Sequence, residues 1–209
     1  MNKSTYEQKI IYKIGSKTQK NGNNNHGSNV RLTEVKHLAP LGINKERKMD
    51  AVIMDVSSDA REIIELVSFL CEEGFENIIV FSHLGEKDFY LMQISFFEGG
   101  IPAIPLKCSK GENRRDLLKS VKGSLTGSFL VVYSTSLSGY DIEEAREAHR
   151  KSGKGATLLL SFSALEGVYF ENEIFDYLEM TSDLERGAIS RIFEDDEASI
   201  YYLSSYELY

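Results

Sequence analysis

Apolar residues along this chain fall into two kinds of segment: short continuous runs, and longer stretches with helical spacing. Runs such as Ile78–Phe81 and Phe129–Tyr133 have the length and the β-branched content of buried strands. Asp59–Gly74 and Asp141–Lys151 instead repeat apolar residues every three or four positions, which predicts amphipathic helices. Each of these helices begins with an aspartate that can act as its N-cap. Strands that alternate with helices indicate βαβ units around a mostly parallel sheet.

The same reading extends over most of the chain. The predicted strands are Lys9–Gly15, Asp50–Val56, Ile78–Phe81, Ile101–Leu106, Phe129–Tyr133, Ala156–Phe162, Gly167–Phe170 and Ser199–Leu203. The predicted helices are Asp59–Gly74, Phe89–Glu98, Asn113–Val121, Asp141–Lys151, Asn172–Leu178 and Leu184–Glu194. Residues 16–29 are polar and rich in Asn and Gly, which is typical of a flexible loop. No linker divides the pattern, so we expect a single domain over residues 1–209.

Composition narrows the class of protein. The 209 residues are 42% hydrophobic and 27% charged, as in an ordinary soluble globular protein. No run approaches the roughly 20 apolar residues of a membrane span, and the N-terminal sequence lacks the apolar core of a signal peptide. We therefore expect a cytoplasmic protein without membrane contact. Cys71 and Cys108 stand far apart in the sequence, so free thiols are expected rather than a disulfide or a zinc site.

The net charge of −8 conceals an asymmetry. Residues 1–48 hold ten Lys and Arg against three Glu, whereas residues 166–209 hold twelve Asp and Glu against two Arg. A basic N-terminal region could attract a ligand that carries phosphate, although a solvated surface is the plainer interpretation. Nucleic acid is not expected as a partner, because the chain is acidic overall and its basic residues lack interleaved aromatic side chains.

Three segments resemble a known family. Ile63–Phe81, Asp141–Gly153 and especially Gly167–Tyr177 (GVYFENEIFDY) are similar to segments of the sugar-1-phosphate nucleotidyltransferases, of the glucose-1-phosphate thymidylyltransferase and cytidylyltransferase type. These enzymes join a nucleoside triphosphate to a sugar phosphate and release pyrophosphate. The resemblance implies a Rossmann-like, three-layer α/β/α fold of the nucleotidyltransferase (GT-A-like) type with a mixed, mostly parallel sheet. Ser161–Glu166 stands where the family has a longer E-K-P segment, so the sugar-binding half is expected to be truncated.

The resemblance also implies a phosphate-binding loop after the first strand. The family's loop ends in G-x-G-T-R, and here Gly15, Gly27 and Arg31 match positions that could still bind a nucleotide or a phosphate. The family's phosphate-contacting lysine falls at Leu41, which can neither donate a hydrogen bond nor neutralise charge. Lys36, or a lysine further along the chain, could take its place.

The metal site implied by the resemblance is altered as well. The family binds Mg²⁺ through two aspartates, and the corresponding positions are Thr135, after a buried strand, and Ser204, near the end of the domain. Hydroxyl groups are weak ligands for a hard dication. Asp141 lies nearby in the sequence, but its place at a helix start favours capping. We therefore expect no intact catalytic residue, no metal and no cofactor, with Mg²⁺ required only if the chain is active.

Other side chains allow sharper or plainer interpretations. His83 and His149 lack the spacing of a metal site, so structural or solvated roles are favoured. Arg114 and Arg115 could grip a phosphate, although an exposed helix face is the plainer interpretation. Phe96 and Phe97, like the C-terminal tyrosines, could serve the core or an interface with a partner.

Two functions from different classes follow. The leading hypothesis is a catalytically degenerate nucleotidyltransferase-like protein, which acts as a regulatory or scaffolding subunit or as a ligand sensor. Its partner would be a second copy of the chain or an intact paralogue, and its ligand a nucleotide or a sugar phosphate. The alternative is an active Mg²⁺-dependent nucleotidyltransferase with rearranged site residues. Binding of a nucleotide without turnover is a third possibility.

Overall fold

The structure is a computed structural model, which describes residues 49–54, 57–162 and 164–204. All of them belong to one compact unit, residues 45–209. The strand predicted at Lys9–Gly15 and the loop predicted at 16–29 lie outside the described residues. The prediction of a single domain over residues 1–209 therefore stays a prediction.

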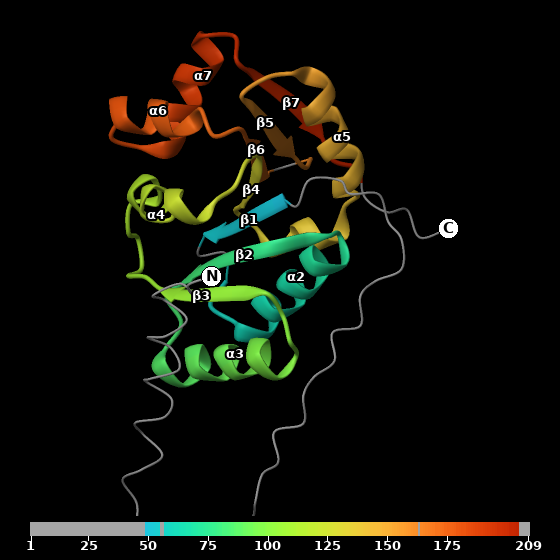
Figure 1. The fold of residues 1–209 in the computed structure, drawn as a ribbon, viewed down its shortest axis with the longest axis vertical. Coiled ribbons are helices and arrows are strands. Elements are labelled where there is room, and N and C mark those ends of the chain that lie inside the picture. Colours follow the sequence, from blue (N-terminus) through green and yellow to red (C-terminus); the bar gives the residue numbers. More distant parts are fainter. Residues whose placement is uncertain (1–48, 55–56, 163, 205–209) are drawn as a thin grey trace, which may run out of the picture. The chain divides into compact units, whose positions relative to one another are not determined.

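Seven strands form one sheet in the order β3-β2-β1-β4-β6-β5-β7, as Figure 1 shows. The strands are β1 (Met49–Met54), β2 (Phe75–Ser82), β3 (Ala103–Lys107), β4 (Phe129–Val132), β5 (Ala156–Leu160), β6 (Leu165–Phe170) and β7 (Ala198–Tyr202). Strand β6 is antiparallel to both of its neighbours, and every other pair in this sheet is parallel. The mixed, mostly parallel sheet predicted from the sequence is thus confirmed.

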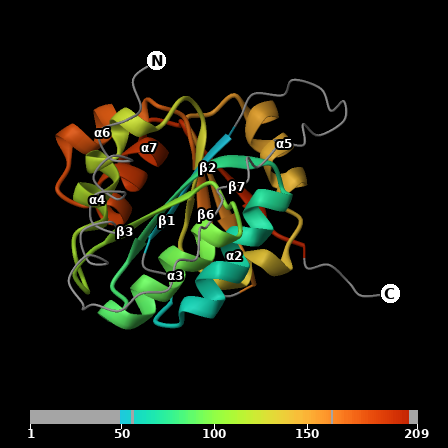
Figure 2. The same ribbon diagram turned by 60° about the horizontal axis from the view of Figure 1, so that its bottom comes forward.

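Helices cover both faces of the sheet (Figure 2). One face carries α2 (Ala60–Glu72), α3 (Glu86–Glu98) and α5 (Ile142–Ser152). The other carries α4 (Arg114–Ser120), α6 (Ile174–Met180), the π-helical segment η3 (Leu184–Ile189) and α7 (Ser190–Glu194). Successive residues of a strand point to opposite faces of the sheet and pack against different helices. In β1, Ile53 packs in the core on the side of α2, and Val52 packs in the core on the opposite side. The chain is therefore a three-layer α/β/α structure.

Local sequence signals account for the helix starts. Asp59 Oδ1 accepts a hydrogen bond from the Arg61 amide at 2.8 Å, and Asp141 Oδ1 accepts from the Glu143 and Glu144 amides at 3.1 and 3.2 Å. Both aspartates are therefore N-caps, as predicted, and the Asp141 carboxylate is occupied by backbone donors. Two short 3₁₀ segments, η1 (Lys122–Ser124) and η2 (Thr135–Gly139), flank β4.

The helix predicted at Leu184–Glu194 is one segment in two parts. Its first six residues form η3, and only the last five form the α-helix α7. Gly187 lies against Thr181, so that a Cβ atom at residue 187 would stand 2.8 Å from the Thr181 Cβ atom. A glycine is therefore needed for this close approach, which the hydrophobic pattern alone does not indicate.

Candidate ligand site at the carboxyl ends of the strands

The order of the strands marks one edge of the sheet as the place for a ligand. Strand β1 lies between β2 and β4, and the chain runs from β1 outward to β3 before it returns to β4 on the other side. In open α/β sheets, ligands bind beyond the carboxyl ends of the strands at such a point of reversal. The segments that follow β1 and β4 are therefore the candidate site. Asp55 and Val56, which follow β1, lie outside the described residues.

In the segment that follows β4, a cluster of hydroxyl groups lies against the carboxylate of Glu166. Ser136 Oγ donates to Glu166 Oε2 at 2.5 Å, and the Oγ atoms of Ser134 and Ser136 are 2.7 Å apart. Glu166 lies near the start of β6, next to Gly167, which pairs with Val132 of β4. Because β6 runs antiparallel to β4, the amino end of β6 meets the carboxyl end of β4. The Tyr133 amide donates to the Glu166 carbonyl at 2.9 Å and fixes this juxtaposition.

Gly167 allows the two strands to meet this closely. A Cβ atom at residue 167 would stand 2.8 Å from the Val131 carbonyl oxygen. Any larger residue would push β6 away from β4, and Glu166 would move with it. The glycine of the family-like segment therefore has a physical role in this chain: it brings the carboxylate to the hydroxyl cluster.

The hydroxyl groups decide the charge state of Glu166. The residue is buried, which by itself raises the pKa of a carboxyl group. Hydrogen bonds from Ser136, Ser161 and Ser134 act in the opposite direction and prevail, so that the pKa of Glu166 lies below its usual value. The carboxylate is thus ionised at neutral pH and held by neutral donors.

The two positions predicted for the lost metal ligands do not meet. Thr135 is the first residue of η2, between Ser134 and Ser136, whereas Ser204 follows β7. Strands β6 and β5 separate β4 from β7, which corresponds to roughly 14 Å at the usual spacing between neighbouring strands. Ser204 is therefore not part of the hydroxyl cluster, and the carboxylate that faces the cluster is Glu166.

The described residues at this edge, which leave out Asp55 and Val56, do not fit the two-carboxylate Mg²⁺ site that the resemblance implies. Among residues 49–54, 57–162 and 164–204, no group of three His, Cys, Asp or Glu gathers closely enough to hold a metal ion. The cluster after β4 offers one carboxylate and several hydroxyls, and Mg²⁺ in proteins is usually bound through carboxylates and phosphates.

A pocket of about 380 Å³ extends the site toward β3. Cys108, which follows β3, contributes to its lining together with Asn113 and Arg114 at the start of α4 and Glu185 in η3. Cys108 is a free and buried thiol, as predicted, and burial raises its pKa. A pocket of this size admits a small organic ligand.

Arg114 joins this pocket to the end of β4. Its guanidinium lies 5.0 Å from the centre of the Tyr133 ring and pairs with Glu185 at 2.9 Å. The hydroxyl group of Tyr133 is buried and has no hydrogen-bond partner among the described residues, and burial strongly raises its pKa. Arg114 is thus partly exposed and paired within the fold, which differs from a plain exposed helix face, and its binding of a phosphate stays a prediction.

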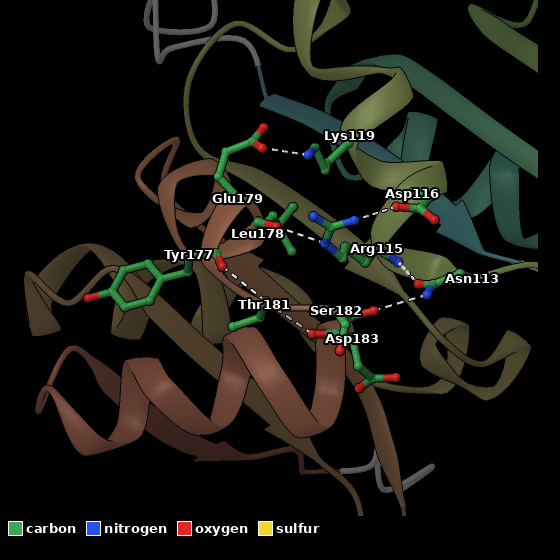
Figure 3. Close-up of polar contacts among 10 residues, drawn as sticks. All are labelled: Asn113, Arg115, Asp116, Lys119, Tyr177, Leu178, Glu179, Thr181, Ser182 and Asp183. Atoms are coloured by element: carbon green, nitrogen blue, oxygen red, sulfur yellow. Dashed lines mark hydrogen bonds and ion pairs between the residues drawn. The ribbon is translucent and has the colours of Figure 1, made fainter.

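The guanidinium of Arg115 also makes its contacts within the protein, as Figure 3 shows. Its Nε atom donates to the Leu178 carbonyl at 2.7 Å, at the end of α6, and its Nη1 atom pairs with Asp116 at 2.6 Å. Asn113 Nδ2 donates to the Ser182 carbonyl at 3.0 Å, and Lys119 pairs with Glu179 at 2.7 Å. Helix α4, which carries the pocket wall, is therefore fixed to α6 by several polar contacts.

The remaining predicted site residues cannot be placed. Gly15, Gly27, Arg31, Lys36 and Leu41 all lie outside the described residues, so their roles in phosphate binding stay predictions. The described sheet limits the length of the loop after its central strand. Strand β1 lies between β2 and β4, and only residues 55–59 separate β1 from α2.

Glu166 is the site residue that the sequence analysis missed. In the sequence it is only the last residue of the shortened segment Ser161–Glu166. The signal that could have found it is the glycine that follows: an antiparallel strand beginning at Glu166-Gly167 beside β4 brings this carboxylate to the residue after Tyr133. That pairing partner is not apparent from a hydrophobic pattern alone.

No protein-family model matches the sequence, and no curated protein matches it. Solved structures do. The inositol-1-phosphate CTP transferase from T. maritima superposes with a TM-score of 0.51 and 9% identity, over 74% of this chain and 85% of that one. HddC from Yersinia pseudotuberculosis superposes with a TM-score of 0.51 and 10% identity, over 76% of this chain and 92% of that one. Glucosyl-3-phosphoglycerate synthase from Mycobacterium tuberculosis superposes with a TM-score of 0.50 and 8% identity, over 76% of this chain and 72% of that one.

The chain has the fold of these three structures. This confirms the predicted fold class. At such low identity the likeness concerns the fold alone, and two of the three structures are named for different enzymes. Within the described residues, no helix is long and apolar enough to cross a membrane.

Proposed function

We propose that the chain is a catalytically degenerate relative of the nucleotidyltransferases, which acts as a regulatory or scaffolding subunit or as a sensor of a small phosphorylated ligand. The observation that carries this proposal is the cluster at the carboxyl end of β4. Thr135 stands between two serines, of which Ser136 donates its hydroxyl hydrogen to Glu166. A neutral threonine thus stands where the resemblance implies an aspartate, and the nearby carboxylate already accepts hydrogen bonds.

Two further features support a ligand and a partner. The pocket between β3 and η3 lies at the edge where sheets of this topology bind ligands. Structures with the same fold are named for CTP and for phosphoglyceric acid, which favours a phosphorylated ligand here. Helix α3 exposes Tyr90, Leu91 and Phe97 by 53%, 48% and 85%. Large apolar side chains gathered on one helix suit a protein partner.

A thermal-shift panel tests this proposal. Nucleoside triphosphates and sugar 1-phosphates are added to the full chain with and without Mg²⁺, and pyrophosphate release is measured in parallel. We expect a higher melting temperature with at least one ligand and no pyrophosphate. Release of pyrophosphate at ordinary enzyme rates in the presence of Mg²⁺ would overturn the proposal. A chain that binds none of the ligands and stays monomeric by light scattering would also contradict it.

The alternative is an active nucleotidyltransferase with rearranged residues, and Glu166 is the observation in its favour. An ionised carboxylate at the carboxyl edge of the sheet is a residue type that such chemistry uses. This alternative requires that Glu166→Gln abolishes pyrophosphate release, while Glu194→Gln, an exposed carboxylate at the end of α7, leaves it unchanged. If wild-type protein releases no pyrophosphate, the alternative fails.

A further inference from the structure

A second pocket, of about 510 Å³, lies at the opposite edge of the sheet. Its lining includes His149 near the end of α5, the turn of Gly153 and Gly155 that leads into β5, and Glu171 just after β6. Strands β5 and β7 begin here, whereas the candidate site lies where β1 and β4 end. A ligand in this second pocket would therefore not compete with one at the hydroxyl cluster. The volume suits a small organic group.

His149 forms the buried floor of this pocket. The side chain is 1% exposed, and its ring stacks on Tyr169 with a centroid distance of 5.5 Å. Its Nδ1 atom lies 2.8 Å from Thr157 Oγ1, which in turn lies 2.7 Å from Ser199 Oγ. In the part of the chain that the structure describes, its Nε2 atom has no aligned hydrogen-bond partner, although Glu171 Oε1 lies 3.3 Å away. Burial lowers the pKa of His149 more than Glu171 raises it, so the ring is neutral at neutral pH.

The contacts of the ring decide where its single proton lies. A carboxylate 3.3 Å from Nε2 favours the tautomer with the proton on that atom, so that Nδ1 accepts from the Thr157 hydroxyl. Glu171 Oε1 also accepts a hydrogen bond from Ser128 Oγ at 2.6 Å. Two neutral groups therefore orient Glu171, and neither cancels its negative charge.

The charges around the pocket leave it electronegative. Three carboxylates, those of Glu171, Glu173 and Glu197, contribute to the lining. The two basic lining residues have partners outside the lining: Arg150 pairs at 3.2 Å with Glu147, which also pairs with Lys151 at 3.5 Å, and Lys154 pairs with Asp196 at 3.1 Å. The carbonyl groups at the end of α5 add negative potential. A ligand with a positive charge is therefore favoured.

The other residues that line the pocket favour an organic cation over a metal ion. Within the described residues these carboxylates do not form a group that could hold a metal ion. Buried Ile174 and Ile192 supply apolar surface beside the carboxylates. Tyr177 also lines the pocket, and Figure 3 shows its ring turned away from the contacts between α4 and α6. An aromatic face beside carboxylates suits an ammonium group on an apolar stem.

We propose that this pocket binds an alkylammonium group, with Glu171 as its counter-ion and His149 as the residue that positions Glu171. The group could belong to a free amine or to a lysine side chain of a partner protein, because both present the same chemistry. The inference does not rest on the proposed function, since it concerns residues at the other edge of the sheet.

An NMR titration tests the inference with n-butylammonium as the probe. We expect saturable shifts of the amide signals of Gly153, Gly155 and Tyr177, with n-butanol and butyrate as neutral and anionic controls that leave these signals in place. Glu171→Gln keeps the size of the side chain and is expected to weaken binding at least tenfold. Glu144→Gln, an exposed residue at the other end of α5 and outside the lining, is expected to bind as wild type does.

Each outcome bears on the proposal. Equal shifts with n-butanol or butyrate would overturn it, as would unchanged binding in both Glu171→Gln and a second variant, Glu197→Gln. The second variant keeps the test decisive if the first does not fold. A lysine-containing peptide that binds more tightly than n-butylammonium would identify a protein partner as the source, and equal affinity would identify a free amine. CTP at the other edge is expected to leave the titration unchanged.

Discussion

Ser136 Oγ and Glu166 Oε2 lie 2.5 Å apart, although thirty positions separate the two residues in the sequence. The contact joins the segment after β4 to the start of β6 and closes the hydroxyl cluster around a buried carboxylate. Hydrogen bonds to an ionised group are among the stronger ones in proteins. This contact therefore determines both the charge state of Glu166 and the shape of the candidate site.

Replacing Ser136 by alanine should raise the pKa of Glu166. Its folded-state pKa lies below the usual 4.5, so the group stabilises the fold above that pH and loses its contribution as pH falls through the folded value. Without the Ser136 donor, this loss should be smaller and should be complete at a higher pH, and unfolding at neutral pH should cost about 1–3 kcal/mol less. A ¹³C NMR titration of Glu166 with denaturant unfolding measures both. Ser138→Ala, which removes only a bond to the Thr135 carbonyl, should leave the pKa unchanged.

His149 predicts a second dependence on pH. Because burial lowers its pKa below the usual 6.5, the unfolded chain binds more protons than the folded one once the pH falls below that value. The free energy of unfolding should therefore decrease as the pH falls from about 6.5 toward the folded pKa, and be nearly flat above. In His149→Gln this decrease should vanish. Urea unfolding at pH 7.5, 6.5 and 5.5 measures it, and an identical decrease in both proteins would refute the assignment.

Arg115 and Lys119 offer a matched test of the contact between α4 and α6. Arg115 is largely buried and donates to the Leu178 carbonyl, whereas Lys119 pairs with a Glu179 side chain that is 60% exposed. Arg115→Ala leaves a carbonyl without its donor and should cost about 1–3 kcal/mol of stability. Lys119→Ala should cost much less stability than Arg115→Ala, because exposed ion pairs contribute little. Comparable losses in the two variants, measured by urea unfolding, would contradict this account.

Neighbouring phenylalanines in α3 should respond in opposite ways. Phe96 is 2% exposed and packs in the core, whereas Phe97 is 85% exposed. Phe96→Ala should lower the free energy of unfolding by about 3–5 kcal/mol. Phe97→Ala should change it by less than about 0.5 kcal/mol but should weaken any self-association through α3. Unfolding in urea and light scattering over a range of concentrations measure the two effects. A large loss of stability in Phe97→Ala would show that this ring is buried.

Local signals in the sequence were sufficient for most of the fold. From Asp50 onward every predicted strand and helix is present, because each is specified by nearby residues such as the caps Asp59 and Asp141. The three-layer α/β/α arrangement was predicted from the family resemblance, because the segments that match the family form helices and strands. The division of Leu184–Glu194 was missed because it depends on the contact between Gly187 and Thr181, which are packed together by the tertiary fold.

The candidate site was harder to predict because it depends on contacts between distant segments. The family resemblance is what identifies Thr135, but its neighbour Glu166 becomes visible only when β6 is known to run antiparallel to β4. Arg114 and Arg115 were judged from their own helix, while their partners Glu185 and Leu178 come from η3 and α6. Long-range pairing is a property of the folded sheet, and periodicity does not encode it.

A carboxylate introduced at Thr135 tests whether this position is a degenerate metal site. In Thr135→Asp, a second negative charge would stand at the edge where Glu166 is ionised, so the pKa of Glu166 should rise and stability at neutral pH should fall by about 1 kcal/mol. Mg²⁺ should then raise the melting temperature of Thr135→Asp, because a second carboxylate supplies the ligand that the wild type lacks. Ser138→Asp, an exposed position in the same η2 segment, should show no response to Mg²⁺. If Mg²⁺ raised the melting temperature of the wild type equally, Thr135 would not weaken Mg²⁺ binding. The proposed degeneracy would then lack its structural basis.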